Sequence, residues 1–225
     1  MSITFDEVEE LAESSLTFYE LCERYPSGRH LRIYQERGKC TLLDADELRR
    51  RVRTLGTRLQ AACAPQQRVM LLLPRIEDYI VGLLACFHAG LVAVPTVVDA
   101  SARSDAKAEM ITAVRADSGA SSLLADDDIR QWLEPREDMA GVAFLGVPAP
   151  DDDEAVPSPA RTVGRDDLAM MMYTSGSTSL PKGVMFDHRT LVFQAALAAV
   201  LWEIEADSTV VSWLPLTHNF GLPLG

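Results

Sequence analysis

The sequence predicts an α/β fold, with doubly wound, mostly parallel sheets that carry helices on both faces. Between residues 68 and 146, short apolar runs without polar alternation recur, as expected of strands buried on both faces. Stretches with helical periodicity, roughly 10 to 15 residues long, separate several of these runs. The chain has 225 residues, of which 48% are hydrophobic and 24% are charged, so it can bury a substantial core.

The N-terminal residues predict a helix over residues 4–25. Thr4 with Glu7, and Thr17 with Glu20, both have the spacing of a capping box, in which a hydroxyl and a carboxylate satisfy backbone N–H groups at a helix start.

A hairpin and a long helix are expected next. Residues 31–35 and 40–44 alternate as two strands joined by a tight turn. Asp44 with Glu47 can cap the helix that follows. Its apolar face repeats at spacings of four, three and four, at Leu48, Val52, Leu55 and Leu59. Four neighbouring arginines are interpreted as the solvated face of this helix: Arg49, Arg50, Arg51 and Arg53.

Strands and helices then alternate, which predicts a parallel sheet. The expected strands are 68–74, 91–95, 121–126 and 142–146, and the expected helices are 77–89, 104–117 and a short one around 129–133. Residues 147–167 contain four prolines and six acids without periodicity, which indicates a loop or linker, with an acidic interaction segment as the alternative. Beyond it we expect strands at 168–174, 183–187 and 209–215, and a helix over 188–202.

Charge and targeting signals narrow the class of protein. The net charge is −12, and residues 1–150 and 151–225 each carry −6, which argues against binding to a nucleic-acid backbone. The N-terminus lacks the pattern of a signal peptide, and no apolar run approaches the roughly 20 residues of a membrane span. Cys22, Cys40, Cys63 and Cys86 have no metal-site spacing, so free thiols and a cytoplasmic location are expected.

One loop carries a chemical signal. Residues 174–183 read Thr-Ser-Gly-Ser-Thr-Ser-Leu-Pro-Lys-Gly after a buried strand, and hydroxyl and backbone N–H groups in such a loop can bind phosphate oxygens. Lys182 is one of only three lysines in a chain with 18 arginines. An ordinary Ser/Thr/Gly turn is the alternative on these grounds. The loop is not a Walker A motif, because Pro181 precedes the lysine and Gly183 follows it.

As a whole string, YTSGSTSLPKGV (173–184) resembles the phosphate loop of the adenylate-forming enzymes, a superfamily of acyl-CoA synthetases, fatty-acyl-AMP ligases, luciferases and peptide-synthetase adenylation domains. DHRTLV (187–192) and SWLPLTHNFGL (212–222) are similar to its neighbouring motifs. Ser179 and the WLPL string favour the fatty-acyl-AMP ligase branch, and the resemblance runs from about residue 16 to 225. The second motif departs from the usual residues of the branch at Thr217, Asn219 and Phe220.

The resemblance implies the residues of the site. Those that would bind the phosphates of ATP, used with Mg²⁺, are Thr174, Ser175, Gly176, Ser177, Thr178, Lys182 and Gly183. His218 would lie beside the substrate carboxylate and the α-phosphate as the catalytic residue, although composition alone favours a structural histidine. No metal ligand is expected within this chain. His88 and His188 are both interpreted as structural histidines, His88 in the core, and a site role is the alternative for His188.

The resemblance also sets the expected organisation and partners. The chain would be a partial N-terminal AMP-binding domain, with an α/β portion (1–146), the acidic Pro-rich loop (147–167), a phosphate-loop portion (168–225), and no C-terminal domain. Expected partners are a fatty or other carboxylic acid, an acyl carrier protein or CoA, and the missing C-terminal half in the same or another chain. The alternative is a non-catalytic module that binds a nucleotide or a partner.

Overall fold

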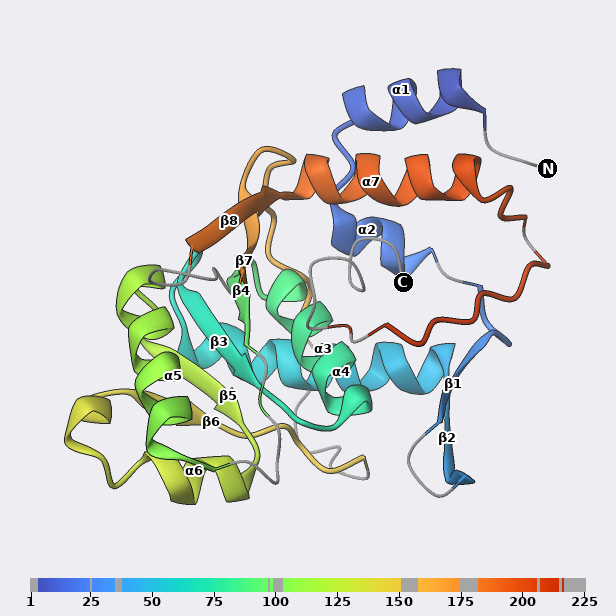
Figure 1. Cartoon of the computed structure of the whole chain (residues 1–225). Coiled ribbons are helices and arrows are strands. Elements are labelled where there is room, and N and C mark those ends of the chain that lie inside the picture. The colour runs from blue at the N-terminus through green and yellow to red at the C-terminus, as the bar shows by residue number, and fades with distance from the viewer. Residues whose placement is uncertain are drawn as a thin grey trace.

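The computed structural model describes residues 4–24, 26–34, 38–96, 98, 103–150, 158–174, 182–205, 207–214 and 216. A six-stranded sheet lies at its centre, and a two-stranded hairpin projects at one side (Figure 1). In spatial order the strands of the sheet are β6 (Ala143–Leu145), β5 (Ser122–Ala125), β3 (Arg68–Leu72), β4 (Val92–Pro95), β7 (Leu168–Thr174) and β8 (Lys182–Asp187).

The sheet has the predicted parallel arrangement. Of the five strand pairs in this sheet, four are parallel, and β8 alone runs antiparallel to its neighbour β7. From β3 the chain adds β4 on one side and then β5 and β6 on the other, which is a doubly wound order. The predicted fold class is therefore confirmed.

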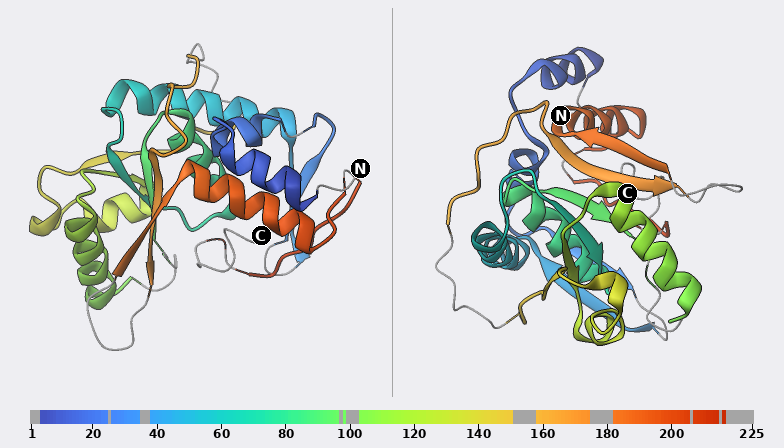
Figure 2. Two further views of the ribbon diagram at one scale, coloured as in Figure 1. Left: turned by 90° about the horizontal axis from the view of Figure 1, so that it is seen from above. Right: turned by 90° about the vertical axis from the view of Figure 1, so that its left-hand side faces the viewer.

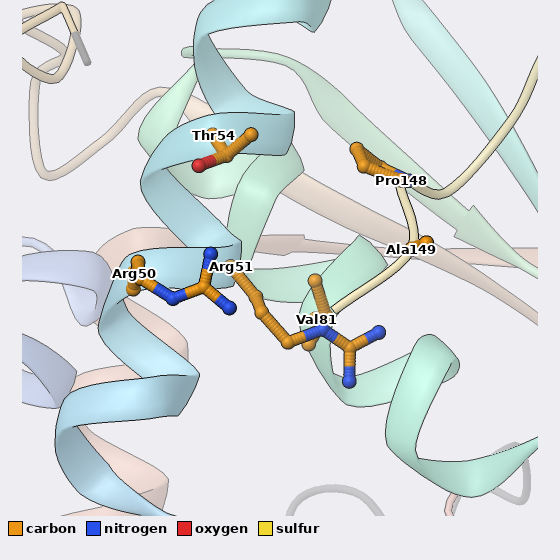
Figure 3. Close-up of a pocket in the computed structure, with 6 residues that line it drawn as sticks. All are labelled: Arg50, Arg51, Thr54, Val81, Pro148 and Ala149. Carbon is orange, nitrogen blue, oxygen red and sulfur yellow. The ribbon is translucent and has the colours of Figure 1, made fainter. Parts of the chain in front are cut away.

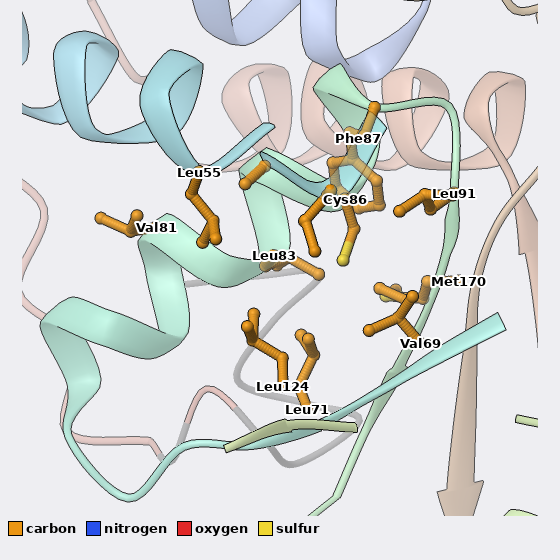
Figure 4. Close-up of a cluster of buried hydrophobic side chains, with 14 of the residues drawn as sticks. Leu55, Val69, Leu71, Val81, Leu83, Cys86, Phe87, Leu91, Leu124 and Met170 are labelled. Carbon is orange, nitrogen blue, oxygen red and sulfur yellow. The ribbon is translucent and has the colours of Figure 1, made fainter. Parts of the chain in front are cut away.

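Helices cover both faces of this sheet, as expected. Helices α3 (Ala45–Ala62) and α4 (Ile76–His88) lie on one face, and α5 (Asp105–Ser118) and α6 (Asp127–Leu133) lie on the other (Figures 1 and 2). Successive side chains of β3 alternate between two apolar clusters, because neighbouring residues of a strand point to opposite faces. Val69 and Leu71 pack with α3 and α4 (Figure 4), whereas Met70 and Leu72 pack with α5 and α6.

The N-terminal helix prediction was wrong in one respect. Instead of one helix over residues 4–25, the structure has α1 (Phe5–Glu13) and α2 (Phe18–Glu23). Both predicted capping boxes are present, and the second one causes the break. Thr17 has extended backbone angles (φ −87°, ψ 159°) as an N-cap residue, and a continuous helix cannot pass through that conformation.

The predicted hairpin and the helix after it are both present. Strands β1 (His30–Tyr34) and β2 (Cys40–Asp44) pair antiparallel, and Asp44 ends β2 and caps α3. One carboxylate oxygen of Asp44 accepts the N–H groups of Asp46 and Glu47, at 3.0 and 2.8 Å. The expected apolar face is confirmed, since Val52, Leu55 and Leu59 are buried and Leu48 packs against the same cluster.

The arginines of α3 do not all lie on a solvated face. Arg49 and Arg50 pair with acids one turn earlier in α3, but the Arg51 side chain is only 7% exposed and binds Asp78 of α4 at 2.7 Å. The solvated interpretation was therefore wrong for Arg51. Arg51 lies directly before Val52 of the apolar face, where α3 packs on α4, and the acid at the start of α4 compensates its charge.

The described parts of the Pro-rich segment, residues 147–150 and 158–167, contain no helix or strand, as predicted. Arg161 fastens this segment to the ends of two helices. Its guanidinium donates to the carbonyl groups of Gln60 and Cys63 at the end of α3 and of Ala89 at the end of α4, over 2.7, 3.0 and 3.1 Å. These carbonyls lack partners within their own helices, and a cation is favoured at that end of a helix. Residues 151–157 lie outside the described residues.

The last described helix, α7 (His188–Leu201), lies alongside α1 in the views of Figures 1 and 2. The strand predicted at 209–215 was wrong for residues 209–214, which form no strand. Val211 and Trp213 are 86% and 87% exposed, and no described strand lies beside them to provide backbone hydrogen bonds.

No helix among the described residues has both the length and the apolar character needed to cross a membrane.

Candidate functional site

The predicted phosphate loop is framed by the hairpin of β7 and β8. Strand β7 is anchored in the core, since Met170 and Met172 are at most 1% exposed and Met171 is 8% exposed. At the loop end of the hairpin, Thr174 pairs with Lys182 and Tyr173 pairs with Gly183. The seven residues from 175 to 181 connect these two pairs. The sequence therefore places the hydroxyl-rich stretch between two strand ends that are held next to each other.

The structure describes three of the predicted site residues. Thr174, Lys182 and Gly183 lie together at the end of the hairpin, and Lys182 is exposed. The other predicted residues lie outside the described residues, so their roles stay predictions: Ser175, Gly176, Ser177, Thr178 and His218.

Gly183 occupies a position with little room for a larger residue. A Cβ atom built on it would lie 3.0 Å from the Tyr173 ring carbon that bears the hydroxyl, and 3.1 Å from the hydroxyl oxygen. The two residues are opposite each other on antiparallel strands, so their side chains share one face of the sheet. The Tyr173 ring thus lies across the backbone of Gly183, one residue after the lysine.

Sequence reasoning missed a contact beside the loop. The Tyr173 hydroxyl donates to Oδ2 of Asp117, near the end of α5, at 2.6 Å. Partial burial and the neighbouring Asp117 carboxylate together raise the pKa of Tyr173, which keeps the hydroxyl protonated as a donor. The two residues are 56 positions apart, and neither belongs to a local pattern that would link them.

The stretch that contains His218 is attached to α4 at its beginning. The Tyr79 hydroxyl donates to the carbonyl of Leu216 at 3.2 Å, two residues before His218, and Leu216 also packs against the core of this face. The first turn of α4 therefore fixes the position of Leu216 in this stretch.

His88 and His188 are both internal. His88 is 2% exposed and packs edge-on against Tyr19, which confirms its interpretation as a core histidine. His188 begins α7 directly after β8, is fully buried, and contacts the edge of the Phe87 ring, with centroids 5.6 Å apart. Within the described part of the chain, neither ring nitrogen of His188 has a hydrogen-bond partner. Burial lowers the pKa of both histidines, so both are neutral at neutral pH.

Two hollows among the described residues lie away from the hairpin. A small cavity of about 10 Å³ holds no more than one water (Figure 3). It is lined by Arg50, Arg51 and Thr54 of α3, Val81 of α4, and Pro148 and Ala149 after β6. A groove of about 410 Å³ lies between α3 and the β6 end of the sheet, opposite the edge formed by β8. Neither hollow includes a predicted site residue.

The described residues suit one part of a nucleotide site. An exposed lysine at a strand start, next to a loop rich in hydroxyl groups in the sequence, fits polyphosphate. They do not form a metal centre, since the described ranges contain no group of three or more His, Cys, Asp or Glu side chains arranged around an ion. Cys22, Cys40, Cys63 and Cys86 are free thiols, as predicted.

The fold belongs to the doubly wound α/β class, with a lysine-bearing hairpin at the edge of its sheet, and comparison with known proteins identifies the family. The family model described as AMP-binding enzyme matches residues 18–224, so this chain belongs to the AMP-binding, adenylate-forming family. Its fatty-acid ligase relatives and the structures below agree with the resemblance to fatty-acyl-AMP ligases.

Relatives of the chain include three ligases. It is 28% identical over 205 residues to the medium-chain-fatty-acid–[acyl-carrier-protein] ligase JamA of Moorena producens. The matching region covers 88% of this chain and 35% of JamA. It is 35% identical to the putative fatty-acid–CoA ligase fadD21 of Mycobacterium leprae, covering 71% of this chain and 29% of the relative. The long-chain-fatty-acid–AMP ligase FadD26 of Mycobacterium marinum is 31% identical, with 72% and 29% covered. The chain therefore spans about a third of the length of these relatives.

Solved structures share the fold. The fatty acyl-adenylate ligase from L. pneumophila, in complex with acyl adenylate and pyrophosphate, superposes with a TM-score of 0.81 at 21% identity, over 99% of this chain and 38% of the ligase. McyG A-PCP, complexed with phenylalanyl-adenylate, gives a TM-score of 0.80 at 19% identity, over 93% of this chain and 34% of McyG.

Proposed function

We propose that this chain is the N-terminal part of an ATP-dependent, fatty-acyl-AMP ligase-like enzyme. The observation that carries the proposal is the hairpin of β7 and β8, which holds Lys182 and Gly183 opposite Thr174 and Tyr173, within a match to AMP-binding enzymes over residues 18–224. The activity belongs to the cytoplasm and to a protein that includes the remaining C-terminal half, in the same chain or in another.

The reaction forms an acyl-adenylate. An oxygen of the substrate carboxylate bonds to the α-phosphorus of ATP, the bond to the bridging α–β oxygen breaks, and pyrophosphate leaves with that electron pair. Two anions must approach each other, so neutralisation and positioning supply most of the catalysis. Mg²⁺ bound to the phosphates supplies positive charge in this reaction.

The residues of this chain bind and position the nucleotide. The lysine of the hairpin neutralises charge on the β- and γ-phosphates, while the backbone and hydroxyl groups donate to their oxygens. The phosphate-binding set is Thr174, Ser175, Gly176, Ser177, Thr178, Lys182 and Gly183. His218 is the proposed catalytic residue and donates toward the substrate carboxylate and the α-phosphate.

The substrate and acceptor follow from the relatives. JamA and FadD26 are named as ligases of medium-chain and long-chain fatty acids, which supports a fatty acid here. Transfer to an acyl carrier protein is proposed because the printed name of JamA specifies that acceptor. CoA is the second candidate acceptor, favoured by the 35% identity to the putative CoA ligase fadD21.

ATP–pyrophosphate exchange in the presence of fatty acids tests the proposal. We expect no exchange from this chain alone, since it spans about a third of its relatives, and exchange when the C-terminal half is supplied. Robust exchange by this chain alone would contradict its proposed incompleteness. Absence of exchange after completion would favour the second candidate function, a non-catalytic module that binds a nucleotide or a partner.

The lysine separates a phosphate site from an ordinary turn. Lys182→Ala in the completed enzyme should raise KM for ATP, because the phosphates lose a point charge, while KM for the fatty acid changes little. Lys39→Ala is the matched control, since Lys39 is also exposed but precedes β2, away from the hairpin. Equal ATP kinetics in the two variants would refute the phosphate-binding role of Lys182.

A further inference from the structure

The structure connects the phosphate-loop hairpin to helix α5 through one side chain. Tyr173 is the next-to-last residue of β7, and its ring packs against the apolar cluster that α5 and α6 share with the sheet. Its hydroxyl reaches past this cluster and donates to Asp117 at 2.6 Å. One residue thus touches the core, the opposite strand and a helix.

The position of Asp117 on α5 needs an explanation. It lies in the last turn of the helix, where the exposed carbonyl groups disfavour a negative charge. Helix stability therefore does not account for an acid at this place. The bond to Tyr173 does, because a hydrogen bond to a charged acceptor is among the stronger ones available to a hydroxyl.

The ring of Tyr173 acts on the other strand. Gly183 lies directly opposite, and its lack of a side chain lets the ring cross the β8 backbone, since a Cβ atom there would come within 3.0 Å of the ring. The next residue toward the loop on β8 is Lys182. Anchoring the hydroxyl on α5 consequently fixes the ring, and the ring limits where the start of β8 can lie.

We propose that Tyr173 and Asp117 are positioning residues for nucleotide binding, which hold both ends of the phosphate loop at a fixed place against α5. Neither residue needs to touch the nucleotide. This inference rests on the proposed function of the loop and extends it, because it makes the affinity for the triphosphate depend on a helix that carries no predicted site residue.

The test compares variants of the completed enzyme, in which this chain is supplied with its C-terminal half. Tyr173→Phe removes only the hydroxyl and keeps the ring over Gly183, and Asp117→Ala removes the acceptor. Tyr34→Phe is the matched control, because Tyr34 is 69% exposed on the β1–β2 hairpin. The dissociation constants of MgATP and of inorganic triphosphate are measured by calorimetry, and amide hydrogen exchange is followed in peptides covering β7 and β8 without ligand.

We expect Tyr173→Phe and Asp117→Ala each to raise the dissociation constant about three- to tenfold, the effect of losing one such hydrogen bond. The double variant should be no weaker than either single variant, because both remove the same bond. Exchange at the start of β8 should rise in all three variants but not in Tyr34→Phe.

The outcomes separate this inference from the function on which it rests. Unchanged affinity and unchanged exchange in Tyr173→Phe would overturn the positioning role while leaving the phosphate site intact. Faster exchange with unchanged affinity would also overturn it, since Tyr173 would then be merely structural. If the unaltered completed enzyme binds neither MgATP nor triphosphate while Tyr173→Phe speeds exchange, the Tyr173–Asp117 contact is supported and the proposed nucleotide function fails.

Discussion

Gly56 of α3 packs directly against His88 of α4, and this contact gives a sharp prediction. A Cβ atom added there would lie 2.8 Å from Cγ and 3.2 Å from Cβ of His88, and nearer still to Nδ1. The imidazole has no free space into which it can retreat. His88 is 2% exposed, and its ring stands at 90° to that of Tyr19, with centroids 5.3 Å apart. Gly56→Ala must therefore displace a helix or the ring.

Two opposing effects determine the magnitude. Replacing glycine by alanine inside a helix is favourable by about 1 kcal/mol, because the unfolded chain has less conformational freedom to lose. Overpacking a filled core costs about 1–3 kcal/mol, and contacts below 3 Å with a confined ring belong to the upper part of that range. Gly56→Ala should therefore lower the free energy of unfolding by about 1–2 kcal/mol.

Urea unfolding followed by circular dichroism measures this effect in two backgrounds. In the His88→Ala background the two contacts with the ring are gone and only the 3.2 Å contact with Cβ remains, so the same Gly56→Ala change should become neutral or stabilising, by up to about 1 kcal/mol. This reversal of sign distinguishes a clash with His88 from any other effect of the methyl group. Stabilisation by Gly56→Ala in the unaltered chain, or the same loss in both backgrounds, would refute the reasoning.

Three further predictions concern stability. The pKa values of His88 and His188 are lowered by burial, so the unfolded chain takes up protons first as pH falls below about 6.5. The free energy of unfolding should then decrease toward pH 5, and it should decrease less steeply in His188→Phe. An equal pH dependence in His188→Phe and the unaltered chain would contradict a contribution from His188. Arg161→Ala should cost about 2–3 kcal/mol, because three helix-end carbonyls lose their donor, and Arg103→Ala at a surface ion pair is its control in urea unfolding. Asp44→Ala should cost about 1 kcal/mol in the same assay and Asp44→Asn less; equal losses would deny the cap.

Most of the sheet could be predicted from sequence, because a strand buried on both faces must be apolar throughout. Arg68–Leu72 and Ser122–Ala125 are such strands, and their apolar runs placed them within two residues. Residues 209–214 are also rich in apolar and β-branched residues, but they form no strand. Apolar and β-branched residues indicate which segments can pair, but whether they do depends on a neighbouring strand that the segment itself does not encode.

Contacts between residues that are far apart in the sequence could not be predicted from it. Arg51 was placed on a solvated helix face because three arginines surround it, yet it meets Asp78, 27 residues later. Tyr173 meets Asp117 across 56 residues. The phosphate loop itself was recognisable because its residues are consecutive, whereas the residues that support it are distant in sequence and become neighbours only through packing.

The two strands of the hairpin are buried to different extents, and this difference determines which strand fixes the position of the loop. Strand β7 lies inside the sheet, with Met170 fully buried, whereas β8 forms the edge, with Val184 43% and Met185 66% exposed. Burial therefore fixes β7 far more strongly than β8. The position of the start of β8 therefore depends on its contacts with β7. Among the described side-chain contacts between the two strands, the Tyr173 ring over Gly183 is the one nearest the loop. A variant that weakens the outer edge of β8, such as Met185→Ser, should consequently disturb nucleotide affinity less than removal of the single Tyr173 hydroxyl.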